Sequence, residues 1–259
     1  MDQNLRDYAN VKRYGPVVRE ERFFCAVLFH LLLTDEATLR RLLEKAGVPN
    51  HENYTCDSVR VFVEYAMARD LWNSLDDDGK ANEKKKKFIL DCLGNPSGLE
   101  NLETEEFNKK LVAGSKISKD KIQSPARWGE EKIKVFFKDQ KFIENACKLK
   151  WAFNVKPDIV IELAQDSVVC IEAKVESGQD VYTVAGYTQT QSDVQKYLMT
   201  DLLGFNLYQV FLAPKNSKAN EGKKIHHITW SELLNENGGT NTTITEAVKR
   251  VVAIEGGEE

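Results

Sequence analysis

The chain has 259 residues, of which 42% are hydrophobic and 29% are charged, enough to form one sizeable hydrophobic core with an attached lobe. Only 15 residues are glycine and 6 are proline, which excludes a fibrous or largely disordered protein. A formal net charge of -4 excludes a uniformly basic protein that coats nucleic acid, but it allows a local basic surface.

Cysteine and histidine form no familiar disulfide or metal pattern. The five cysteines are scattered without a CxxC pair, and the four histidines lack the spacing of zinc ligands, so we expect reduced thiols and no structural zinc. The N-terminus is charged where a secretory signal is apolar, and the longest apolar run, residues 23–33, is far shorter than the roughly 20 residues that span a bilayer. These features predict a soluble, cytoplasmic protein with no membrane partner.

The first half of the chain has a helical pattern. Residues 17–33 predict a buried helix, because they are apolar on nearly every side after the first turn. Thr34 can cap a second helix over residues 35–46, which Gly47 would end. The pattern then stays helical to residue 124 without a strand signal, with amphipathic runs near residues 58–74, 80–93 and 104–113.

Ser124 and Pro125 can begin a further helix, and after it the spacing of apolar residues becomes that of β-strands. Runs rich in β-branched residues predict strands at residues 148–154, 158–163, 168–176, 207–214 and 224–230. Helices are predicted near residues 190–203, from Ser231, and over residues 244–254. This order predicts an α/β core with an attached helical lobe.

The residues that carry chemistry converge on one predicted hairpin. If its strands pair across a three-residue loop at 164–166, the residue numbers of any two paired residues add up to 330. Asp158 then lies opposite Glu172. Lys174 shares their face, because side chains alternate along a strand. Adjacent carboxylates repel each other, and a divalent cation relieves the repulsion. Oxygen ligands without nearby His or Cys predict Mg²⁺ or Mn²⁺. The alternative is that the three residues only decorate a strand edge.

Pro157-Asp158 followed by Glu172-Ala173-Lys174 resembles the motif of the PD-(D/E)XK nuclease superfamily, and the order of predicted elements is similar as well. The resemblance implies a restriction-endonuclease-like αβββαβ core, with a mixed sheet flanked by helices. It implies that Asp158, Glu172 and the Ala173 carbonyl hold Mg²⁺, and that Lys174 orients or activates the attacking water. The implied activity is Mg²⁺-dependent hydrolysis of phosphodiester bonds, of DNA in particular, as in bacterial defence or restriction.

The family also carries a glutamate on its first helix, for which three candidates remain open. Glu21 lies on an apolar stripe, where a carboxylate is costly unless it binds something, although a helix N-terminus also favours an acid there. Glu20 is its neighbour, and Glu131 lies on the helix directly before the strands. With Glu21 as this acid, a catalytic residue and a further ligand of the Mg²⁺ ion, the domains are a core helix at residues 1–34, a helical insertion or lobe at 35–124 and the nuclease core at 125–259.

Two glutamines stand one turn apart on the helix after the motif, Gln191 and Gln195. They resemble the signature with which some branches of the family position the lysine and the substrate phosphate. A capping box formed by Ser192 and Gln195 is an equally good explanation of Gln195.

A basic segment precedes the hairpin, since residues 109–156 hold thirteen lysines and arginines against five acids. Such residues can neutralise phosphates, so nucleic acid is the expected partner. A homodimer or a larger effector complex also remains open. The four lysines at residues 84–87 are instead expected to form a solvated helix end. The alternative function is a catalytically silent nucleic-acid-binding or adaptor protein that keeps the fold.

Overall fold

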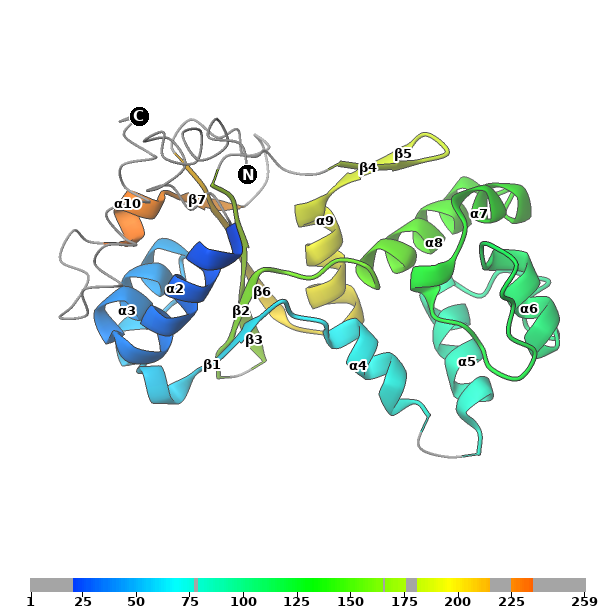
Figure 1. Ribbon diagram of the computed structural model, residues 1–259, viewed down its shortest axis with the longest axis horizontal. Helices are drawn as coiled ribbons and strands as arrows, with labels where there is room; N and C mark the ends of the chain where they lie inside the picture. The colour runs from blue at the N-terminus through cyan, green and yellow to red at the C-terminus, as the bar shows by residue number, and fades with distance from the viewer. Residues whose placement is uncertain (1–20, 77–78, 165, 176–180, 215–224, 235–259) are drawn as a thin grey trace, which may run out of the picture. The chain divides into compact units, whose positions relative to one another are not determined.

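The computed structural model describes residues 21–76, 79–164, 166–175, 181–214 and 225–234 (Figure 1). These residues form an α/β protein in which helices pack against a mixed five-stranded sheet. The chain divides into two compact units. The first, named here the sheet unit, lies within residues 1–65, 157–179 and 204–259, and the second, the helical unit, lies within residues 66–156 and 180–203.

The strands of the sheet unit follow the order β1-β2-β3-β6-β7. β1 and β2 pair antiparallel, as do β2 and β3, whereas β6 is parallel to both β3 and β7. The strand bounds are β1 Arg60–Val63, β2 Ile159–Glu162, β3 Ser167–Ala173, β6 Asn206–Leu212 and β7 His226–Ile228. This mixed sheet confirms the α/β class predicted from the sequence.

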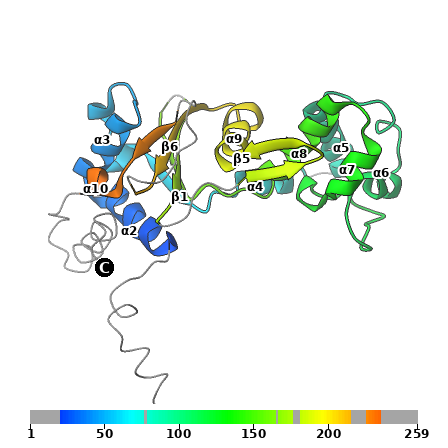
Figure 2. The same ribbon diagram turned by 90° about the horizontal axis from the view of Figure 1, so that it is seen from above.

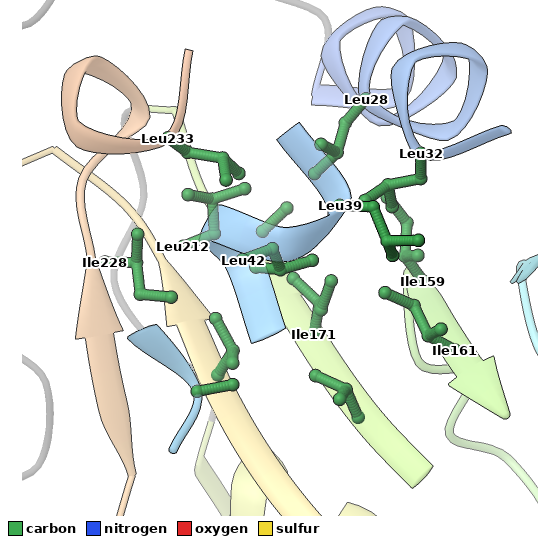
Figure 3. Packing of buried hydrophobic residues seen from close by; sticks show 14 of the residues in the cluster. Leu28, Leu32, Leu39, Leu42, Ile159, Ile161, Ile171, Leu212, Ile228 and Leu233 are labelled. Carbon is green, nitrogen blue, oxygen red and sulfur yellow. The ribbon is translucent and has the colours of Figure 1, made fainter. Parts of the chain in front are cut away.

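The hairpin of β2 and β3 has the predicted register, with Ile159 opposite Ile171 and Val160 opposite Cys170. Alternate side chains of the sheet therefore enter one apolar core. Three helices cover that face, namely α2 Glu21–Thr34, α3 Glu36–Lys45 and α10 Trp230–Leu233. Figure 3 shows Leu28, Leu32, Leu39, Leu42 and Leu233 of these helices packed around Ile159, Ile161, Ile171, Leu212 and Ile228.

The junction of α2 and α3 is built one residue later than predicted. Asp35, not Thr34, caps α3, and its carboxylate accepts hydrogen bonds from the Ala37 amide at 3.1 Å and the Thr38 hydroxyl at 2.6 Å. Aspartate can satisfy two donors at once, which explains the preference. Gly47 follows the end of α3 with a φ of 73°, as predicted for a glycine stop.

The helical unit contains helices and the hairpin β4–β5 (Figure 2). Its elements are α4 Met67–Ser74, α5 Ala81–Leu93, α6 Thr104–Leu111, the 3₁₀ turn Pro125–Arg127, α7 Glu130–Phe136, α8 Gln140–Ala152, β4 Val181–Val184, β5 Tyr187–Thr190, α9 Gln191–Lys196 and the π-helical turn Tyr197–Leu202. Tyr182 and Tyr187 of the hairpin stack on Trp151 of α8, with ring centroids 5.6 and 5.7 Å away. The hairpin is thus anchored by aromatic contacts.

Several local predictions are wrong. Residues 148–154 are not a strand, because residues 148–152 form the end of α8. Residues 58–74 are not one helix, because β1 occupies Arg60–Val63 and α4 begins only at Met67. The lysine run is not simply solvated either, since Lys85 is 3% exposed and its Nζ lies 2.5 Å from Asp76 Oδ1.

The compact units also divide the chain differently from the predicted domain limits. Residues 35–65, expected in the lobe, contain α3 and β1 and belong with the sheet unit. Residues 125–156, expected in the core, contain α7 and α8 and belong with the helical unit. The helix predicted at residues 244–254 lies outside the described residues. Across the described part of the chain, no helix is long and apolar enough to cross a membrane.

Candidate active site

The predicted hairpin brings three of the site residues to one end of the sheet unit. Asp158 directly precedes β2, Glu172 lies near the end of β3, and Lys174 follows β3. The Ala173 amide donates a hydrogen bond of 2.9 Å to Asp158 Oδ2 across the hairpin. This bond fixes the Asp158 carboxylate beside the strand that carries Glu172 and Lys174.

Lys174 connects two glutamates. Its Nζ lies 2.6 Å from Glu172 Oε1 and 3.3 Å from Glu21 Oε1 at the start of α2. The side chains of Glu172 and Lys174 are only 2% and 9% exposed, whereas that of Glu21 is 30% exposed. We name Glu21, Asp158, Glu172 and Lys174 the acid–lysine cluster. The cluster is buried on the strand side and reaches solvent on the side of Glu21.

Burial and mutual repulsion shape the charges of the cluster. Burial, and next the charge of Glu172, raise the pKa of Asp158 to about 7, although the Ala173 hydrogen bond and Lys174 oppose the shift. Burial alone would lower the pKa of Lys174, but Glu172, Glu21 and Asp158 outweigh it and raise that pKa above its usual value. Near neutral pH, Lys174 therefore keeps its proton, whereas the raised pKa places Asp158 near the midpoint of its titration.

Two cysteines lie close enough to feel these charges. Burial raises the pKa of Cys25, which stands one turn after Glu21 on α2, and the carboxylates of Asp158 and Glu21 raise it further. Burial likewise raises the pKa of Cys170 on β3. Both thiols stay protonated at neutral pH, so the cluster contains no thiolate nucleophile.

Trp230 supports the cluster from α10 and was not among the predicted site residues. Its Nε1 donates a buried hydrogen bond of 2.9 Å to the Lys174 carbonyl oxygen. Its ring lies 6.0 Å from that of Phe24, three residues after Glu21 on α2. Trp230 therefore contacts both elements that carry the ion pair. In the sequence, Trp230 falls at the end of the predicted strand 224–230, whereas in the structure it opens α10, two residues after β7 ends.

The other candidates for the first-helix acid are placed differently. Glu20 lies outside the described residues. Glu131 is exposed on α7, in the helical unit. Glu21 is the candidate that contacts Lys174.

Gln191 and Gln195 both lie on α9 in the helical unit and are 8% and 1% exposed. The capping box of this helix is formed by Thr190 and Asp193. The alternative, a capping box of Ser192 and Gln195, is therefore wrong. Helix capping therefore does not account for Gln195. Its role at the site, and that of Gln191, stay predictions.

The oxygen donors of the cluster suit a cation that keeps much of its water. Within the described residues, no group of three or more His, Cys, Asp and Glu side chains is arranged to hold a metal ion. Asp158 and Glu172 nevertheless lie near enough for one charge to raise the pKa of the other carboxyl. Mg²⁺ commonly binds proteins through one or two carboxylates and retains several waters. The oxygen chemistry of this carboxylate pair fits Mg²⁺ or Mn²⁺.

Comparison with family models, with curated proteins and with solved structures gives no match to this chain.

Proposed function

We propose that this chain is a Mg²⁺- or Mn²⁺-dependent nuclease with a restriction-endonuclease-like core, and that it hydrolyses phosphodiester bonds of DNA. The observation that supports this proposal most is the buried ion pair of Lys174 and Glu172. Beside it, the Asp158 carboxylate is fixed by a 2.9 Å hydrogen bond from the Ala173 amide to Asp158 Oδ2. The Pro-Asp and Glu-Ala-Lys motif formed by these residues resembles that of the PD-(D/E)XK nucleases and supports the same interpretation.

Each residue of the cluster has a role in this proposal. Asp158, Glu172 and the Ala173 carbonyl would hold the cation. When bound, the cation would neutralise the scissile phosphate and lower the pKa of the attacking water. Lys174, which stays protonated at neutral pH, would donate a hydrogen bond to that water or to a phosphate oxygen as negative charge develops.

Glu21 gives Lys174 a second partner. If Glu172 held a cation, its attraction for Lys174 would weaken, and Glu21, 3.3 Å from Lys174 Nζ, would hold the ammonium group in place. Because Glu21 is the most exposed of these ion-paired side chains, substrate would approach from its side of the cluster. Glu21 is thus proposed as the first-helix acid.

The test is a cleavage assay with purified protein on linear and circular DNA and on RNA. We expect cleavage of DNA in Mg²⁺ or Mn²⁺ and none in chelator, while Ca²⁺ binds without turnover. Cleavage of circular DNA would identify an endonuclease. Activity that survives exhaustive chelation would contradict the two-carboxylate mechanism. Binding without cleavage under every metal condition would favour the silent nucleic-acid-binding protein.

A further inference from the structure

A closed loop in the helical unit displays a local excess of cations, and the two ends of the loop are held together. Residues 114–127, named here the lysine loop, hold four basic residues and one acid. The chain segments that enter and leave the loop are joined by an isolated β-bridge between Val112 and Trp128. The Ala113 amide also donates a hydrogen bond of 3.0 Å to the Arg127 carbonyl. The loop is therefore of the compact Ω type, with its ends held together.

Three amide side chains, named here the amide trio, fix the interior of the loop. They are Asn82 on α5, Asn108 on α6 and Gln123 in the loop itself. Asn108 is 1% exposed and Gln123 is 9% exposed. Burying polar side chains is costly unless they are hydrogen-bonded, so they are placed where the backbone needs partners.

The hydrogen bonds of the amide trio reach the backbones of the basic residues themselves. Asn108 donates to the Lys121 carbonyl at 2.9 Å and to the Ser118 carbonyl at 2.8 Å. Gln123 donates to the Lys116 carbonyl at 3.2 Å. Asn82 donates to the Asp120 carbonyl, between Lys119 and Lys121, at 2.7 Å. The loop backbone is thus held in one conformation without regular secondary structure.

The same residues direct their side chains outward. Lys116, Lys119, Lys121 and Arg127 are all exposed, while the loop's Ile122 is buried. The large hydrophobic side chains that are exposed in the described part of the chain all lie elsewhere. A surface that inserts into a membrane needs exposed apolar side chains beside its cations. A rigid, polar and cationic loop fits phosphates in solution instead.

We propose that the lysine loop is a binding surface for the phosphate backbone of nucleic acid, with Lys116, Lys119 and Lys121 as its contacts. The inference deepens the proposed function, because it rests on nucleic acid as the substrate. Fixing the backbone in advance reduces the entropy lost when the lysines engage successive phosphates. Contacts to phosphates carry no sequence information, so the loop would bind unrelated sequences equally well.

The test measures binding of labelled DNA duplexes of unrelated sequence to the full chain over a range of salt concentrations, with chelator present to prevent cleavage. The triple variant K116Q/K119Q/K121Q should flatten the slope of log affinity against log salt by roughly 0.9 per lost contact, thus by roughly 2.7. The matched control K134Q/K138Q/K141Q removes three exposed lysines from the same basic segment. It should change the slope much less.

A third variant separates rigidity from charge. Asn82→Ala keeps every cation and removes hydrogen bonds to the Asp120 carbonyl and from the Ile122 amide. It should weaken binding several-fold with little change in the salt slope. Binding equal to that of the unmodified chain would overturn the role of the amide trio.

The remaining outcomes distinguish this inference from the nuclease proposal. Equal effects of the two triple variants, no effect of either, or no DNA binding by the unmodified chain would overturn the lysine loop as the surface. If the variant K116Q/K119Q/K121Q lost binding to vesicles of anionic lipid but bound DNA as the unmodified chain does, that result would also overturn the lysine loop as a nucleic-acid surface. If the chain binds DNA through the lysine loop but never cleaves it, the result would support the loop as a binding surface and contradict the proposal that the chain is a nuclease.

Discussion

The indole Nε1 of Trp230 donates a 2.9 Å hydrogen bond to the main-chain carbonyl of Lys174, and both groups are buried. The bond joins α10 to the end of β3 at the residue that carries the cationic side chain. The Trp230 ring also packs near Phe24 on α2, the helix that carries Glu21. The Trp230 side chain therefore fixes the backbone of Lys174 and packs against α2, the helix that carries Glu21, the ion-pair partner of Lys174.

Replacing Trp230 by Phe should keep most of this packing and remove the donor. The Lys174 carbonyl would lose this buried partner, which costs about 1 to 3 kcal/mol of folding free energy. We expect a lower melting temperature and, for the proposed nuclease, a lower kcat with little change in KM, because Trp230 contacts Lys174 rather than the substrate. Trp72→Phe, at a buried tryptophan of α4, serves as the control. An unchanged kcat in folded protein would show that Trp230 has only a packing role.

Asp158 should make stability depend on pH in the absence of metal. Its folded pKa of about 7 lies above the ordinary value of 3.8, so protonation favours the folded state. This contribution is fully present below about pH 4 and is lost as the pH rises through 7. Asp158→Asn removes the titration, so in chelator at pH 8 the variant should be more stable by on the order of 2 kcal/mol. The advantage should shrink toward pH 4.

Divalent cation should reverse this order, since binding stabilises only the protein that has the ligand. Thermal unfolding of both proteins, with and without Mg²⁺, measures the effect. Because binding needs the ionised carboxylate, affinity for Mg²⁺ should rise roughly tenfold from pH 6 to pH 8. A stability difference between the two proteins that does not change with pH would argue against a perturbed Asp158.

Lys174→Gln should destabilise the protein most when no metal is present. It leaves Glu172 buried without its counter-charge, which costs about 3 kcal/mol or more in comparable buried pairs. Mg²⁺ should restore part of this loss while the rate of cleavage stays low. Lys45→Gln breaks a more exposed pair with Glu232 at 3.6 Å and should cost less than about 1 kcal/mol. Similar losses in both variants would mean that Lys174 does not compensate Glu172.

The identity of the first-helix acid can be tested with two charge-neutral substitutions. Glu21→Gln keeps the shape of a side chain that lies 3.3 Å from Lys174, so we expect cleavage to fall at least tenfold with nearly unchanged melting. Glu131→Gln alters an exposed residue of α7 and should cleave DNA normally. The reverse pattern of rates would assign the role to Glu131.

Much of the candidate site could be predicted because a hairpin has simple geometry. A short loop and the two-residue period of strands fix which side chains face each other, and Ile159 does pair with Ile171. The apolar face of the hairpin also predicts on which side the helices pack. By contrast, the sequence does not indicate that Lys174 lies between Glu172 and Glu21, because that contact joins residues distant in the chain.

The helical unit was harder to predict, because its buried helices are apolar on several sides and the spacing of their apolar residues does not distinguish a helix from a strand. Leu149, Trp151 and Phe153 alternate as in a strand, yet the first two lie on α8 and the third is its C-cap. Phe153 contacts Trp72, and Trp151 stacks on the hairpin tyrosines, so this end of the helix is apolar on several sides. The hairpin β4–β5 lacks an Asn-Gly or Asp-Gly turn signal, because its turn is Ala185-Gly186. In the sheet unit, β1 was missed as well; it is an edge strand whose neighbour in the sheet is β2.

The most direct test of the account is single-turnover cleavage of a DNA duplex in Mg²⁺, with enzyme in excess. Three proteins are compared, namely the unmodified chain, Asp158→Asn and the control Asp166→Asn, which changes an exposed aspartate at the turn of the same hairpin. We predict that Asp166→Asn cleaves at the rate of the unmodified chain, and that Asp158→Asn loses at least two orders of magnitude while remaining folded. Equal rates for Asp158→Asn and the unmodified chain would contradict the account.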